Sequence, residues 1–234
     1  MSRFNVLPES TAVMRPGQLR QLARQDAILK AALHLFAERG YFGTAVPDVA
    51  QLANVGTGTI YRYFENKEAL VNAVLMHSID QMWMSVVENE GFDFSKPVRE
   101  IFREFWWRLV RFVREYPDEF RFLELQYHVP YRSSESFERE RAGMAPIWFF
   151  VHLARQAGVA RDQSVEMTVA LVWGLFIGLH KAGYSGYIDV TQETFERAEE
   201  NAWAVFSDGH DGLVYVSSYT LPIDNVFSNR DAAI

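Results

Sequence analysis

The stretch 44–67 constrains the fold more than any other part of this 234-residue chain. Within it, apolar residues at helical spacing are interrupted by Asn54, Gly56 and Gly58, which are small or turn-forming residues. The pattern predicts two short helices joined by a tight turn. Such a pair can present the side chains of its second helix to the major groove of DNA, and an ordinary helical hairpin would show the same spacing.

The net charge of −7 argues at first against a nucleic-acid partner, but the charges are unevenly distributed. Residues 15–68 include seven basic and five acidic residues, whereas residues 69–234 include 15 basic and 24 acidic ones. A basic N-terminal part on an acidic body attracts phosphate at one end and discourages the rest of the protein from wrapping DNA.

Several classes of protein are disfavoured by composition. Cysteine is absent, which excludes disulfides and thiol catalysis and fits a reducing cytoplasm. The longest apolar stretch, between Glu166 and Lys181, falls short of the roughly 20 residues of a membrane-spanning helix. None of the six histidines has neighbours at metal-ligand spacing, and no phosphate loop, nucleophile elbow or acid pair is visible. We expect a soluble cytoplasmic protein with no membrane partner, no metal, no cofactor and no enzymatic activity.

Apolar residues at helical spacing continue through most of the chain and predict an all-α fold. Gly40 is expected to end the first helix, Asn54 to adopt a left-handed turn conformation, and Pro146 to kink or break a later helix. The expected helices cover about residues 24–39, 46–53, 57–63, 67–87, 96–116, 118–128, 137–157, 163–183 and 192–206.

Four regions follow from this pattern. They are a flexible N-terminal arm (1–22), a three-helix helix-turn-helix domain (23–68), a larger helical domain (69–207) and a C-terminal tail (208–234). Arg15 and Arg20 in the arm, together with Arg24 just after it, could contact an adjacent groove or the DNA backbone, or remain solvated. Residues 213–221 in the tail have the β-branched and aromatic character of a strand, which could dock on the body, dock on a second subunit or stay loose.

Two segments resemble the DNA-binding region of the tetracycline-repressor (TetR) family. They are Phe-Ala-Glu-Arg-Gly-Tyr-Phe-Gly-Thr at residues 36–44 and Gly-Thr-Ile-Tyr-Arg-Tyr-Phe-Glu-Asn-Lys-Glu-Ala-Leu at residues 58–70. The resemblance covers about residues 24–72, and the ending Tyr-x-Tyr-Phe-x-x-Lys-x-x-Leu is specific. Beyond residue 72 only the length and the helical layout resemble the family.

The resemblance implies which residues contact DNA. Phosphate contacts are expected from Thr44, Tyr63 and Lys67, and base-edge contacts mainly from the second helix of the pair. The full candidate set is Thr44, Thr57, Gly58, Thr59, Tyr61, Arg62, Tyr63 and Lys67.

Three positions depart from the family pattern. Ala45 stands where Ser or Thr is usual, which removes a cap and a phosphate contact. Asn54 replaces the usual turn glycine. Gly56 replaces the usual Ser or Thr that caps the second helix, so Thr57 or the bare backbone must serve at that helix end.

Residues 92–150 contain 16 of the 34 aromatic residues. An aromatic stripe at helical spacing is typical of a hydrophobic core, but rings that pack with gaps can also enclose an apolar cavity. The resemblance implies an effector pocket in this domain, and a small apolar or aromatic molecule would suit it. The candidate lining residues are Phe102, Trp106, Phe120, Phe122, Tyr127, Trp148, Phe149 and Trp173.

The expected helix 163–183 is apolar nearly all round, so its apolar surface is larger than one hydrophobic core can cover. Together with the helix 192–206 it resembles the four-helix dimer interface of the family, and burial inside one monomer is the alternative. Dimerisation would space two recognition helices by about 34–36 Å, one turn of DNA. The candidate interface residues are Gly174, Gly178, Phe195, Ala198, Ala202, Trp203 and Phe206.

We therefore expect a homodimeric transcriptional regulator, a repressor released from a DNA operator by a small apolar or aromatic effector. Two alternatives remain from the sequence. One is an enzyme or carrier with an apolar helical pocket, and the other is a helix-turn-helix that contacts only protein.

Overall fold

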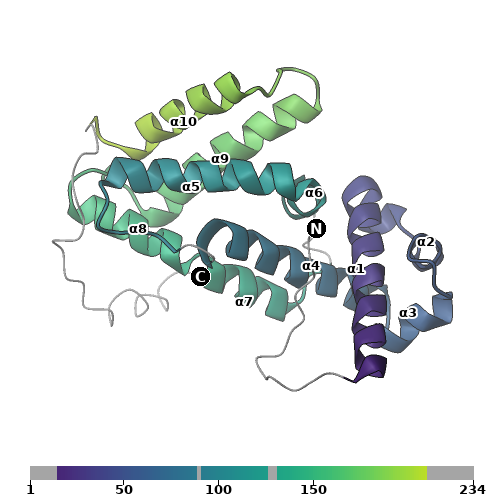
Figure 1. Ribbon diagram of the computed structural model, residues 1–234. Coiled ribbons are helices and arrows are strands. Elements are labelled where there is room, and N and C mark those ends of the chain that lie inside the picture. Colours follow the sequence, from purple (N-terminus) through teal and green to yellow (C-terminus); the bar gives the residue numbers. More distant parts are fainter. Residues whose placement is uncertain (1–14, 89–90, 126–130, 210–234) are drawn as a thin grey trace. The chain divides into compact units, whose positions relative to one another are not determined.

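The computed structural model describes residues 15–88, 91–125 and 131–209. Over these residues the fold is all-helical, as predicted, with one short π-helix, η1 (Figure 1). The elements are α1 (Pro16–Gly43), α2 (Val46–Leu52), α3 (Thr57–Tyr63), α4 (Lys67–Trp83), η1 (Met84–Glu88), α5 (Val98–Glu115), α6 (Pro117–Leu125), α7 (Ser134–Gly143), α8 (Ala145–Gln156), α9 (Val165–Tyr184) and α10 (Gln192–Phe206).

The described residues form two compact units. The first is built from the chain up to residue 83 together with residues 112–140, and the second from residues 84–111 together with the chain after residue 140. The first unit therefore joins the helix-turn-helix segment to α6 and most of α7, which follow much later in the sequence. The predicted division at residue 68 differs from this grouping because α4 and α6 both pack on α1.

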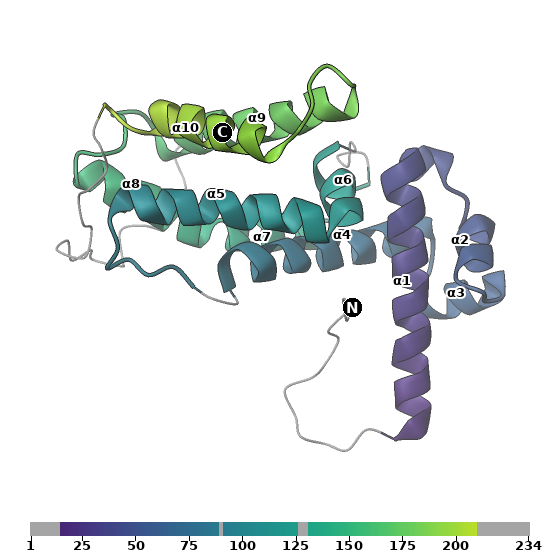
Figure 2. The same cartoon turned by 45° about the horizontal axis from the view of Figure 1, so that its top comes forward.

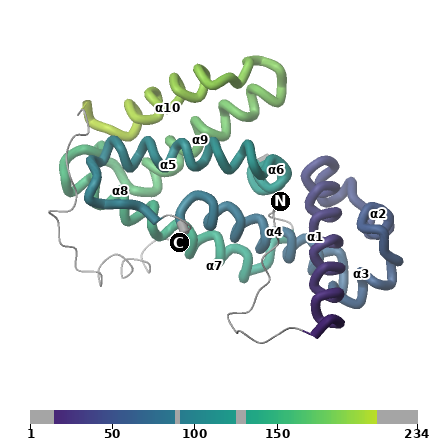
Figure 3. Tube along the Cα trace, in the orientation of Figure 1, coloured from purple at the N-terminus to yellow at the C-terminus, as the bar shows by residue number. Residues whose placement is uncertain are grey.

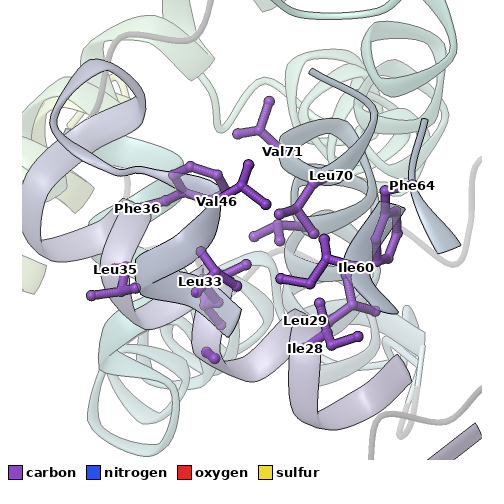
Figure 4. Close-up of a cluster of buried hydrophobic side chains, with 14 of the residues drawn as sticks. Ile28, Leu29, Leu33, Leu35, Phe36, Val46, Ile60, Phe64, Leu70 and Val71 are labelled. Atoms are coloured by element: carbon purple, nitrogen blue, oxygen red, sulfur yellow. The ribbon is translucent and has the colours of Figure 1, made fainter. Parts of the chain in front are cut away.

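The core of the first unit holds α1 to α4 together (Figure 4). Ile28 and Phe36 of α1, Ile60 of α3 and Leu70 of α4 are almost fully buried in it. Phe122 of α6 joins this core by stacking on Phe36, with ring centroids 6.1 Å apart. Burial of these apolar side chains is the main term that stabilises the two short helices α2 and α3, since helices of seven residues are marginal alone.

Helix α1 begins earlier than predicted. Residues 16–22 are helical, which corrects their assignment to a flexible arm. Pro16 suits the first helical turn because the amides there have no intrahelical partner, and the Arg15 amide donates to the Gln18 side chain at 2.9 Å. At the other end the regular helix stops at Gly40, as predicted, because its φ of 69° lies in the left-handed region.

Other local predictions are confirmed by the structure. Helices α3 and α10 have the predicted bounds, and α2 ends one residue earlier than predicted. The expected helix 137–157 is broken into α7 and α8 next to Pro146, which lacks the amide hydrogen needed to continue a helix. The predicted strand of residues 213–221 lies outside the described residues.

The second unit has an aromatic core from α5, α8, α9 and α10. Phe206 packs on Phe102 with ring centroids 5.0 Å apart and on Phe150 at 5.6 Å, and Trp106 meets Phe176 edge-on at 5.2 Å. Helices α9 and α10 run side by side in this unit (Figure 2). Arg99 of α5 also forms a two-point ion pair with the buried Glu199 of α10.

Much of the apolar surface of α9 is left uncovered by the residues that the structure describes. By length and composition, the 20 residues of α9 could cross a membrane, which corrects the expectation that no stretch is long enough. Only 22% of the most apolar 18 residues of the helix are buried. Ser164 caps the helix, because its side chain accepts a hydrogen bond from the Met167 amide at 3.1 Å. The helix therefore starts at Val165, two residues before the apolar stretch that follows Glu166 in the sequence.

Candidate nucleic-acid interface

A tight turn joins α2 to α3. Asn54 has a φ of 54°, the predicted left-handed conformation, and the Val55 amide donates to the Ala50 carbonyl at 2.9 Å. Gly56 stands at the N-cap of α3, where it supplies no side-chain cap. The turn sets α3 beside α2, which packs on α1, so the three helices lie close together (Figure 3).

Helix α3 has a buried face and an open face. Ile60 and Phe64 are 1% and 6% exposed and lie in the core with Ile28 and Leu29 (Figure 4). Five residues of α3 in the predicted DNA-contact set are exposed or half-exposed. They are Thr57, Gly58, Thr59, Tyr61 and Arg62.

Thr44 does not belong to this open surface. Its side chain is 2% exposed, and its hydroxyl lies 2.9 Å from the Gly40 carbonyl oxygen and 3.1 Å from that of Leu35. Both carbonyls belong to the last turns of α1, where Gly40 interrupts the regular helix. The hydroxyl donor is therefore engaged inside the protein, which corrects the prediction of a phosphate contact by this side chain.

Tyr63 and Lys67 lie at the margin of the surface, where both are half-buried. The Tyr63 hydroxyl donates to the Gln21 carbonyl at 3.4 Å and so links α3 to the first half of α1. Lys67 begins α4, whose first turn is capped by the Asn66 side chain accepting the Ala69 amide at 2.8 Å. Partial burial lowers the pKa of Lys67. Contact of either residue with phosphate stays a prediction.

Sequence reasoning missed the aromatic residues beneath Lys67. Its ammonium nitrogen is 4.2 Å from the centre of the Tyr41 ring, and Tyr41 stacks on Tyr131, with centroids 4.2 Å apart. No local pattern links Tyr131 to the helix-turn-helix because it follows α6 in the chain. Only the fold brings these residues together.

Comparison with known families supports the interpretation of α2 and α3 as a DNA-binding helix-turn-helix. Residues 28–74 match the family model described as bacterial regulatory proteins of the tetR family, and residues 76–207 match the Tetracyclin repressor-like C-terminal domain. The second match alone covers more than half of the chain. The chain belongs to the TetR family. It is a helix-turn-helix DNA-binding transcriptional regulator, and regulators of this family are not enzymes.

Individual relatives agree with the assignment to the TetR family. An HTH-type transcriptional regulator of Haemophilus influenzae is 28% identical over 180 residues, which are 76% of this chain and 92% of that protein. The regulator RutR of Escherichia coli is 36% identical over 95 residues, 41% of this chain and 43% of RutR. A TetR family structure from Marinobacter aquaeolei has a TM-score of 0.71 and 26% identity, and the match covers 82% of this chain and 99% of that one.

The predicted effector-pocket residues are divided between the two units. Phe120 and Phe122 are buried in the first unit, and Phe102 and Trp106 are buried in the second. Trp148, Phe149 and Trp173 are half-buried in the second unit, and Tyr127 lies outside the described residues. The four fully buried rings make packing contacts in their own units, so a shared pocket lined by all eight residues stays a prediction.

Two further features of the second unit bear on ligand binding. His180 is 6% exposed between the rings of Phe176 and Phe195, and burial lowers its pKa to about 4, so this imidazole is neutral near pH 7. An open groove of about 410 Å³ lies between α9 and α10 and includes Arg197 and Ala198. Within the described residues, no cluster of three or more His, Cys, Asp or Glu side chains could hold a metal ion.

The predicted dimer residues also fall into two groups. Gly174 and Gly178 are exposed on α9, and a Cβ added at either would meet no atom within 4 Å. Ala198 and Trp203 are half-exposed. In contrast, Phe195, Ala202 and Phe206 are at most 4% exposed, because the apolar side of α10 packs into its own unit. These three are internal contacts, which corrects their assignment to a dimer interface.

Replacing Thr44 by Val tests the internal role of its hydroxyl. Valine preserves the shape and leaves the α1 carbonyls without that donor, so the free energy of unfolding should fall by about 1 kcal/mol. The salt dependence of DNA binding should not change. Urea unfolding and DNA titrations at several salt concentrations measure both effects. A smaller salt slope without loss of stability would instead restore the phosphate contact.

Lys67→Ala and Arg62→Ala should separate two kinds of DNA contact. Loss of Lys67 should weaken binding to every duplex about equally and reduce the salt slope by about one, because one phosphate contact is lost. Loss of Arg62 should cost roughly 1–3 kcal/mol on a specific site and much less on a scrambled one. Fluorescence anisotropy on both duplexes gives the comparison. Equal effects of both variants on all sequences would refute these roles.

Proposed function

We propose that this TetR family regulator is a homodimeric repressor that leaves its operator when a small apolar or aromatic molecule binds its C-terminal helical unit. The observation that carries the proposal is the open apolar face of α9. Met167, Leu171 and Leu175 are 53%, 43% and 40% exposed, and they follow one another at spacings of four residues. Gly174 and Gly178 lie along the same side of the helix.

A second copy of the chain is the occupant that best fits this face. The two exposed glycines let another backbone approach closely, and the surrounding apolar side chains would lose contact with water. Covering α9 in this way also accounts for a membrane-like helix in a DNA-binding protein. A cytoplasmic location is part of the proposal.

A dimer suits DNA recognition by α3. Two copies related by twofold symmetry would present two α3 helices to half-sites about one helical turn apart. An operator of this kind would be nearly palindromic. A dimer bound to the operator through both DNA-binding units can obstruct transcription. For this reason we propose a repressor.

The aromatic second unit supports an apolar effector. Its core contains Trp106 and Phe176, and the half-buried Trp173 stacks on Phe176 with centroids 5.9 Å apart. A protein of the same fold, AibR, has been crystallised with isovaleryl coenzyme A and operator DNA, at a TM-score of 0.63 and 19% identity. The coupling needed is small, because a difference of about 1–3 kcal/mol between two states changes DNA affinity 5- to 150-fold.

Binding of labelled DNA from the region upstream of the gene tests the regulator and its effector together. We expect selective, salt-sensitive anisotropy changes that small aromatic and aliphatic compounds reverse, with scrambled DNA as the control. Tighter DNA binding on addition of a compound would contradict release and indicate a co-repressor. Weak, unselective binding would place the operator elsewhere.

Leu175→Glu should disrupt the dimer, because it places a charge in the middle of the α9 face. Sedimentation should show the wild-type protein at twice the 27.0 kDa chain mass and the variant near the single mass. Leu175→Met is the matched control and should remain dimeric. The monomer should also bind DNA much more weakly. A wild-type protein that sediments as a monomer, or that partitions into membranes, would overturn the proposed use of α9.

A further inference from the structure

Three side chains from distant parts of the sequence form a column at the start of α4. Lys67 lies over the Tyr41 ring at 4.2 Å, and Tyr41 lies on the Tyr131 ring at 4.2 Å with an angle of 26° between the ring planes. Tyr41 belongs to the end of α1, Lys67 begins α4, and Tyr131 precedes α7. All three are in the first unit.

A polar contact holds the base of this column to α4. The Asn72 side-chain nitrogen donates to the Tyr131 carbonyl at 2.8 Å and to the Glu68 carbonyl at 2.9 Å. Its side-chain oxygen accepts the Ser133 amide at 2.8 Å. One asparagine therefore fixes residues 131–133 to the first turns of the helix that carries Lys67.

The environment of the column restricts Lys67. Tyr131 is 8% exposed, and burial raises the pKa of its phenol to about 12, so the ring is neutral at pH 7. Burial also raises the pKa of Tyr41, and the charge of Glu68 adds to that effect. A cation over the face of a neutral ring is attracted to it and loses rotational freedom before any phosphate arrives.

We propose that Tyr41 and Tyr131 are positioning residues for the phosphate contact of Lys67, with Asn72 holding Tyr131 in place. The proposal rests on the DNA-binding role of Lys67. It extends the DNA-binding machinery to residues 131–133, which lie outside the matched N-terminal family domain at residues 28–74. Displacing Tyr131 from α4 removes the support of Tyr41 and leaves Lys67 free to rotate.

The first test compares Tyr131→Ala, Tyr131→Phe and Lys67→Ala in the full-length protein, with labelled duplex DNA over a salt series. A single phosphate contact contributes about eightfold in affinity at 0.1 M salt, since log K changes by about 0.9 per tenfold change in salt. Tyr131→Ala should approach this loss and reduce the salt slope by up to about one. Tyr131→Phe keeps the ring and should behave as the wild type.

The double variant Tyr131→Ala with Lys67→Ala separates positioning from a general structural effect. If Tyr131 acts through Lys67, the double variant should bind DNA as Lys67→Ala does. Additive losses, or an unchanged salt slope in Tyr131→Ala, would overturn the proposal. Absence of DNA binding by the wild type would instead refute the proposed function, so the two failures are distinguishable.

A second variant covers the case in which Tyr131→Ala does not fold. Asn72→Asp keeps the acceptor for the Ser133 amide and removes both donated hydrogen bonds. The salt slope of Asn72→Asp should fall in the same direction as that of Tyr131→Ala.

In the wild type, NMR of labelled lysine should show the signals of the Lys67 side-chain methylene groups shifted upfield by the Tyr41 ring. That shift should decrease in Asn72→Asp, and an unchanged shift would refute the positioning role.

Discussion

The DNA-binding surface depends on the burial of Ile60 and Phe64 against α1. Helices α2 and α3 have seven residues each, and helices of that length are not stable in water by themselves. The two apolar side chains hold α3 in place and determine which side of it remains open. The exposure of Tyr61 and Arg62 is a direct consequence, because residues adjacent to a buried one on a helix point elsewhere.

Features controlled by neighbouring residues were predictable from the sequence. Pro146 breaks a helix by lacking an amide hydrogen, Asn54 adopts a left-handed turn, and α3 and α10 have their expected bounds. The error at residues 16–22 is also local. This segment begins with Pro16, and a proline in the first helical turn sacrifices no hydrogen bond.

The direction in which a helical side chain points depends on partners that the sequence does not show. Helices α9 and α10 both have apolar residues at helical spacing, yet Phe195 and Phe206 of α10 are buried in their own unit. Helix α9 has more apolar surface than one core can cover, and its second face is left open by the described residues. Thr44 illustrates the same limit, since its hydroxyl binds carbonyls that only the end of α1 brings near.

The helix-turn-helix is not self-contained, because the unit that includes it is completed by residues 112–140. The stack of Tyr41 on Tyr131 and the contact of Lys67 with Tyr41 connect these two stretches of sequence at the predicted phosphate contact. Aromatic stacking and cation–π contacts contribute about 0.5–1.5 and 0.5–2 kcal/mol. These values match the roughly 1–3 kcal/mol that allosteric coupling requires. Under the proposed positioning role, a rearrangement of residues 131–133 changes DNA affinity while α3 keeps its place on α1.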